Sequence, residues 1–197
     1  MRRILVAGST GAGKTTLARA VSGRLGIPFH EMDALAITGP GWQENPSLVD
    51  DVSLLSDGPG WVIDSFGRPS VRDLLWERAD TVVWLDYPRP VVMRRVLRRS
   101  AARTLLRRRV FGGNVETFGS WFSAEHPVWW AWSQYETRRT HIATRCTAPR
   151  PTALKVVHLR TPRATETWLA HLAGPPPGPP SEPPPVITPR APDGSWS

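Results

Sequence analysis

Short apolar runs alternate with longer segments of mixed polarity through the first 172 residues. Four runs are rich in β-branched or aromatic residues and have the length of buried strands: 4–7, 61–64, 81–86 and 153–159. A weaker run lies between the first two, at 26–30. Between these runs the pattern favours helices: 17–25, 48–55, 70–78, 90–109, 126–145 and 164–172. Strands that alternate with helices predict a three-layer α/β/α fold around a five-stranded parallel sheet.

The last residues have a different composition. Ten of the 21 prolines lie between Gly174 and Ser197, and few apolar side chains accompany them. Such a segment has little to bury, so we expect residues 173–197 to form a disordered or polyproline II tail. An unstructured extension is the simpler interpretation, and a ligand for a proline-binding domain is the alternative. The length of the remainder suits one domain at residues 1–172.

Charge is distributed unevenly along the chain. The net charge is +8, but no Lys or Arg lies between Arg24 and Arg68, where seven acids occur. Nine arginines and no acid follow between Arg89 and Arg109. The first apolar run is too short for a secretory signal, and no 18-residue apolar window exists, so we expect a cytoplasmic protein without a membrane span. A single cysteine, Cys146, excludes an internal disulfide framework, and no spaced His/Cys set predicts a zinc site.

A glycine-rich motif follows the first predicted strand directly. Residues 8–15 read G-x-x-x-x-G-K-[ST], and the next apolar positions have helical spacing. In this motif backbone N–H groups cradle phosphates, the lysine reaches the β- and γ-phosphates, and the hydroxyl binds Mg²⁺. We therefore predict ATP as the ligand and Mg²⁺ as the cofactor. The predicted nucleotide-binding residues are Gly8, Ser9, Thr10, Gly11, Ala12, Gly13, Lys14, Thr15 and Thr16.

Two acids compete for the role of holding Mg²⁺ together with Thr15. Asp64 and Asp86 each end an apolar strand, and ligands of open parallel sheets bind at the carboxyl ends of the strands. The pattern does not choose between them. A third acid, Asp33, lies in the acidic segment after the second strand and is a candidate to accept a proton from an attacking hydroxyl. A helix cap or a turn residue is an equally good interpretation of Asp33.

The segment from Gly60 to Arg68 resembles the strand and loop of adenylate kinases that run apolar-apolar-Asp-Gly-Phe-Pro-Arg. Asp86-Tyr87-Pro88, with Arg95 and Arg99 on the helix that follows, resembles the next strand and the arginine-bearing helix of that family. The resemblance implies that Asp64 orders Mg²⁺ waters, that Arg68 holds the acceptor phosphate, and that Arg95 and Arg99 contact ATP or the transferring phosphate.

The chain is closer still to the small adenylate-kinase-related proteins called DNA topology modulation proteins, which share D-x-L, P-G-W, V-I-D and W-L-D-x-P segments with it. The resemblance covers residues 1–172 and implies phosphoryl transfer from ATP to a small acceptor, with a short mobile lid at about 103–120. An arginine of the lid, Arg107, Arg108 or Arg109, would close over ATP.

Two departures from adenylate kinases bear on the acceptor. Gly67 stands where the family has proline, and the family's arginine for the AMP phosphate has no counterpart in the base-free segment after Arg24. AMP is therefore disfavoured, and the acids there favour an acceptor with a hydroxyl or amine, held by Asp33. The predicted catalytic residues are Lys14, Asp33, Arg68, Arg95 and Arg99. The acceptor is a nucleoside monophosphate or a hydroxylated metabolite.

Two other functions remain open. The arginines between Arg89 and Arg109 would supply salt-dependent affinity for nucleic acid, with ATP as a regulator of binding. No nucleic-acid-binding motif accompanies them. A slow ATPase that binds a partner through its tail is the other alternative. A GTPase is disfavoured, because no N-K-x-D motif occurs.

Overall fold

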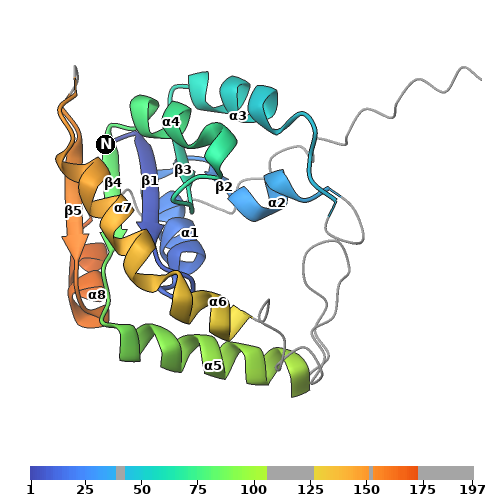
Figure 1. The fold of residues 1–197 in the computed structure, drawn as a ribbon. Coiled ribbons are helices and arrows are strands. Elements are labelled where there is room, and N and C mark those ends of the chain that lie inside the picture. The colour runs from blue at the N-terminus through green and yellow to red at the C-terminus, as the bar shows by residue number, and fades with distance from the viewer. Residues whose placement is uncertain (39–42, 106–126, 151–152, 173–197) are drawn as a thin grey trace, which may run out of the picture.

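The computed structural model describes residues 1–38, 43–105, 127–150 and 153–172 (Figure 1). Most of the predicted lid, with Arg107, Arg108 and Arg109, and the predicted tail at 173–197 lie outside the described residues. Five strands form one sheet in the order β2-β3-β1-β4-β5, and every pairing is parallel. The strands are β1 (Arg3–Gly8), β2 (Phe29–His30), β3 (Trp61–Ile63), β4 (Thr81–Leu85) and β5 (Lys155–Leu159). The predicted five-stranded parallel sheet is confirmed.

The central strand β1 is buried on both faces because helices cover both sides of the sheet. Ile4 and Val6 belong to one apolar core, and Leu5 and Ala7 belong to the other, as the alternation of side chains along a strand requires. All four side chains are fully buried. On the Ile4 side lie α1 (Lys14–Leu25), α5 (Arg89–Leu105) and α8 (Pro162–His171), and on the Leu5 side lie α2 (Met32–Ala36), α3 (Leu48–Asp57), α4 (Pro69–Arg78) and α7 (Tyr135–Thr147). The three predicted layers are therefore present.

Two details of the chain differ from the pattern-based expectation. The segment predicted as an acidic turn region contains a short helix, α2, because Met32 and Ala36 face the core at helical spacing. The predicted helix at 126–145 is two helices, α6 (Pro127–Ser133) and α7, which meet at Gln134. The break redirects the chain from α5, on which α6 packs, to the face of the sheet that α7 covers.

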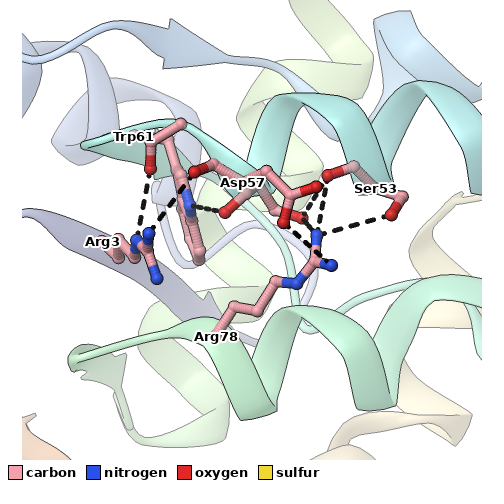
Figure 2. A network of polar contacts seen from close by, with 7 residues as sticks. Arg3, Ser53, Asp57, Trp61 and Arg78 are labelled. Carbon is pink, nitrogen blue, oxygen red and sulfur yellow. Dashed lines mark hydrogen bonds and ion pairs between the residues drawn. The ribbon is translucent and has the colours of Figure 1, made fainter.

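A polar network fixes the amino-terminal edge of the sheet, at the end away from the glycine-rich loop (Figure 2). Arg78 of α4 donates to the Ser53 carbonyl at 2.7 Å and lies 3.0 Å from the Asp57 carboxylate. The buried Trp61 indole donates to the Ser56 carbonyl at 3.2 Å, and Arg3 donates to Gly58. Arg78 thus joins α4 to α3, and the indole satisfies the Ser56 carbonyl, which lies in the last turn of α3 where the helix supplies no N–H.

Candidate functional site

The glycine-rich loop runs between β1 and the first residue of α1 and depends on left-handed backbone. Gly11 and Gly13 have φ of 86° and 97°, a region that favours glycine. A Cβ on Gly11 would lie 2.3 Å from a methyl carbon of Val96 on α5. The loop and α5 therefore pack so closely that there is no room for a side chain at position 11. The loop therefore has the curled form that the motif predicts, with the amino-terminal end of α1 directly behind it.

Lys14 lies at the start of α1 with its ammonium over the loop. Its Nζ donates to the Ser9 carbonyl at 3.1 Å. Burial, together with the positive charges of Arg138 and Arg99, lowers the pKa of Lys14 to about 8, while Asp64 and Asp33 act in the opposite direction. Among the described residues this buried cation has only a neutral carbonyl oxygen as a hydrogen-bond partner, so it is well placed to bind an anion on the loop.

Asp64 is the acid that the structure brings to the loop. The hydroxyl of Thr15 donates to one of its carboxylate oxygens, and the backbone N–H of Met32 donates to the other at 3.0 Å. Burial raises the pKa of Asp64, and these two hydrogen bonds oppose the rise. A hydroxyl and a carboxylate in contact at the loop are oxygen ligands of the kind that Mg²⁺ prefers.

Asp86 does not contact Thr15, although β4 is the other neighbour of β1. Its carboxylate accepts hydrogen bonds from Arg139 at 2.7 and 3.1 Å and lies 2.9 Å from the His158 ring nitrogen. The His158 ring stacks on Trp84 with the ring centroids 4.2 Å apart. These contacts direct Asp86 toward β5 and α7 and are those of a structural ion pair. The role of Asp86 as a metal ligand stays a prediction.

Arg95 and Arg99 lie on the side of α5 that faces the loop, and the contact with ATP that the resemblance implies stays a prediction. Arg95 donates to the Ala12 carbonyl at 2.8 Å, and its guanidinium lies 5.0 Å from the centre of the Tyr87 ring. Both arginines line a cleft of about 640 Å³ that runs along the loop residues from Gly11 to Thr16. The far wall of the cleft comes from α8, a contribution that the sequence did not predict: Pro162, Thr165, Glu166 and Leu169.

The remaining two predicted catalytic residues lie apart from each other. Arg68 forms an ion pair with Glu44 at 2.7 Å, and neither residue lines the cleft. Asp33 lies on α2, exposed, and close enough to Lys14 and Asp64 for its charge to raise the pKa of both. The charge of Asp33 is therefore felt by Lys14 and Asp64, although Asp33, like Arg68, does not line the cleft. Arg68 has Glu44 as its acidic partner.

Two arginines that the sequence analysis missed complete the surroundings of Asp33. The positive charge of Arg72 on α4 lowers the pKa of Arg138, in the first turn of α7, and Arg138 in turn lowers the pKa of Lys14. No local pattern could have found Arg138, because 124 positions separate it from Lys14 and only the docking of α7 brings them together.

The first quarter of the chain matches a family model. Residues 4–57 match the model described as "ATPase family associated with various cellular activities (AAA)". No curated protein matches the chain at a significant level. Among solved structures, shikimate kinase from Acinetobacter baumannii in complex with shikimate is similar over 87% of this chain and 91% of that chain, with a TM-score of 0.54 and 18% identity.

The chain has the fold of a P-loop NTPase. Two further solved structures are similar at lower TM-scores. A gluconokinase from Sinorhizobium meliloti 1021 has 20% identity and a TM-score of 0.45, over 87% of this chain and 93% of that chain. A sugar kinase from Janibacter sp. HTCC2649 has 20% identity and a TM-score of 0.44, over 87% and 94%. No helix in the described part of this P-loop protein is both long and apolar enough to cross a bilayer.

Proposed function

We propose that the protein transfers the γ-phosphoryl group of ATP to a small-molecule acceptor with Mg²⁺ as cofactor. The observation that carries the proposal is the contact of Thr15 with Asp64 beside Lys14, at the mouth of a curled P-loop. The adenylate-kinase-like segment from Gly60 to Arg68 and the likeness of the fold to a shikimate kinase support it. We assign this activity to residues 1–172.

The residues of the loop fit a nucleoside triphosphate and a magnesium ion. The loop has glycines at the close approaches, its lysine has no carboxylate partner in the described part of the chain, and the hydroxyl of Thr15 lies against a carboxylate. Among the described residues no group of three or more His, Cys, Asp or Glu could hold a metal alone, so Thr15, Asp64 and the phosphates would share the ion. When bound, Mg²⁺ neutralises charge on the β- and γ-phosphates.

The protein's own groups supply position and charge. Lys14 and the arginines of the cleft, Arg95 and Arg99, stabilise negative charge on the transferring group, and the loop N–H groups orient it. Asp33 accepts the proton of the acceptor hydroxyl as that oxygen attacks phosphorus. Asp33 is exposed, which leaves its carboxylate accessible to an acceptor. Arg68 stays a candidate for the acceptor if its ion pair with Glu44 opens.

The test follows phosphorylated product by mass spectrometry with Mg·ATP and a panel of hydroxylated metabolites, nucleosides and nucleoside monophosphates. We expect one class of acceptor to give a product. With that acceptor, Asp33→Asn should lower kcat by about 10²- to 10⁴-fold, the usual contribution of a general base, without changing the Kd of ATP. Asp50→Asn is the matched control, because it makes the same change at an exposed position of α3.

Two results would argue against the proposal. ATP binding with no acceptor-dependent product across the panel would favour nucleotide-regulated binding of nucleic acid or slow ATP hydrolysis. Full turnover by Asp33→Asn would leave phosphoryl transfer in place and remove Asp33 from it.

A further inference from the structure

Arg138 is a half-buried arginine whose guanidinium makes no hydrogen bond and no ion pair among the described residues, whereas the neighbouring Arg139 is bidentate on Asp86. A charge that is partly removed from water without an anion costs free energy, so a guanidinium in this position favours a bound anion. The bidentate contact of Arg139 also fixes the first turn of α7, which holds Arg138 in place.

The surroundings of Arg138 add positive charge. Burial lowers the pKa of Arg138, and the charge of Arg72 lowers it further, with only Asp33 opposing. Lys14 is a third cation in the same group, since Arg138 lowers its pKa as well. Asp33 acts on two of these cations, Lys14 and Arg138, while Asp64 also acts on Lys14 and Asp73 acts on Arg72. Among the described residues Arg138, like Lys14 and Arg72, makes no ion pair with a carboxylate.

Aromatic contacts place Arg72 and Arg138 on the same wall of the site. The guanidinium of Arg72 lies 4.3 Å from the centre of the Phe66 ring, and its Nε donates to the Gly67 carbonyl at 3.2 Å. The Phe66 ring also contacts His141, whose ring stacks on it with the centroids 6.3 Å apart. Because His141 lies three residues after Arg138, both project from one side of α7 toward the loop that follows β3.

The position of α7 places Arg138 near the phosphate-binding loop. In Figure 1 the amino-terminal end of α7 lies toward the carboxyl ends of the strands, where β1 enters the loop. Tyr135, one turn before Arg138, donates to the Tyr87 carbonyl at 2.7 Å and thereby fixes that end of the helix. An anion held by Arg138 would thus lie beside Lys14 and Asp33.

We propose that Arg72 and Arg138 bind an anionic group of the acceptor, a carboxylate or a phosphate, and so present its hydroxyl to Asp33. The inference rests on the proposed function and narrows the acceptor to a hydroxylated acid. The segment between Arg24 and Arg68 has no base that could bind an acceptor phosphate, and for that reason AMP was disfavoured. In this proposal the cations for an anionic acceptor come from α4 and α7 instead. A neutral sugar or nucleoside would leave the two guanidinium groups without an anion.

The first test measures anion binding without turnover. The full chain is saturated with Mg²⁺ and a non-hydrolysable ATP analogue, which fills the P-loop, and is then titrated with inorganic phosphate and separately with acetate in a calorimeter. We expect one anion to bind, and Arg138→Gln to weaken it at least ten-fold. Arg138→Lys should keep part of the affinity, because it keeps the charge and loses the fork geometry. Arg145→Gln, two turns along α7 in an exposed ion pair with Asp73, is the control.

Binding of phosphate but not acetate would assign the subsite to a phosphate, and the reverse would assign it to a carboxylate. Absence of anion binding by the wild-type complex, or equal binding by Arg138→Gln, would overturn the inference.

The second test separates this inference from the proposed function. With an active acceptor, Arg72→Gln and Arg138→Gln should raise the acceptor KM at least ten-fold and leave the Kd of ATP unchanged. A productive acceptor without any anionic group would overturn the inference and leave phosphoryl transfer standing. Anion binding in the calorimeter with no product from any acceptor would support the anion subsite and argue against phosphoryl transfer.

Discussion

Gly11 is the position where a single added carbon tests the joint packing of the P-loop and α5. Replacing Gly11 by Ala forces an L-residue to a φ of 86° and puts its Cβ 2.3 Å from the Val96 methyl. The left-handed backbone costs about 1–2 kcal/mol for a residue with a Cβ. The overlap with a fully buried valine adds about 1–3 kcal/mol, the usual cost of overpacking. We therefore expect Gly11→Ala to lower the free energy of unfolding by about 2–5 kcal/mol.

The assay is urea denaturation followed by tryptophan fluorescence and by circular dichroism, with coincident transitions as the check on two-state behaviour. Gly23→Ala is the matched control, because Gly23 is helical in α1 and an added Cβ meets nothing within 4 Å. That change should raise the free energy of unfolding by about 0.5–1 kcal/mol.

A double-mutant cycle separates backbone strain from overlap. Val96→Ala removes the methyl that Gly11→Ala would strike, so in that background Gly11→Ala should cost only the backbone term of about 1–2 kcal/mol. A Gly11→Ala protein as stable as the wild type, or an equal cost in both backgrounds, would refute the packing argument.

Two further predictions concern ionisable side chains. Burial alone would raise the pKa of Asp86, but hydrogen bonds from Arg139 and His158 lower it below its usual 3.8. The stabilisation that Asp86 provides is therefore present above about pH 4 and is lost as the pH falls further. Asp86→Asn should lower the free energy of unfolding by about 1–3 kcal/mol at pH 7 and should make that free energy less dependent on pH in acid. An unchanged acid limb would contradict this. Burial raises the pKa of Cys146 from 9.0 to about 11. Iodoacetamide at pH 8 should thus alkylate Cys146 about 100-fold more slowly in the native protein than in urea, and equal rates would count against the assignment.

The sequence was sufficient where structure is local. Each apolar run became a strand of the sheet, and the glycines of the loop carry the positive φ that the motif requires. The sequence could not distinguish two candidate metal ligands that occupy equivalent positions in the pattern. Asp64 and Asp86 both end strands that flank β1, so strand order gives each of them access to the loop. The hydrogen bond from Thr15 and the ion pair with Arg139 distinguish them, and these partners come from distant parts of the chain.

The acceptor side shows the same limit more strongly. The acidic, base-free segment around Asp33 disfavoured AMP and favoured an acceptor with a hydroxyl or amine, but Arg72 and Arg138 enter that region from helices later in the chain. The end of α6 at Ser133, which sets the direction of α7, has no glycine or proline to mark it. Without that turn the register of α7 against the β3–α4 loop cannot be predicted.

The order of strands in the sheet has a consequence for biosynthesis. β1 leaves the ribosome first, yet its neighbours are β3 and β4, which begin at Trp61 and Thr81. At about 5–20 residues per second, the apolar side chains of β1 stay unpaired for several seconds before either partner strand is made. During that interval the apolar side chains of Ile4, Leu5 and Val6 are exposed on the nascent chain and can aggregate with other unfolded chains. The stretch that later organises the nucleotide site is therefore also the one that most needs a chaperone while the chain is being translated.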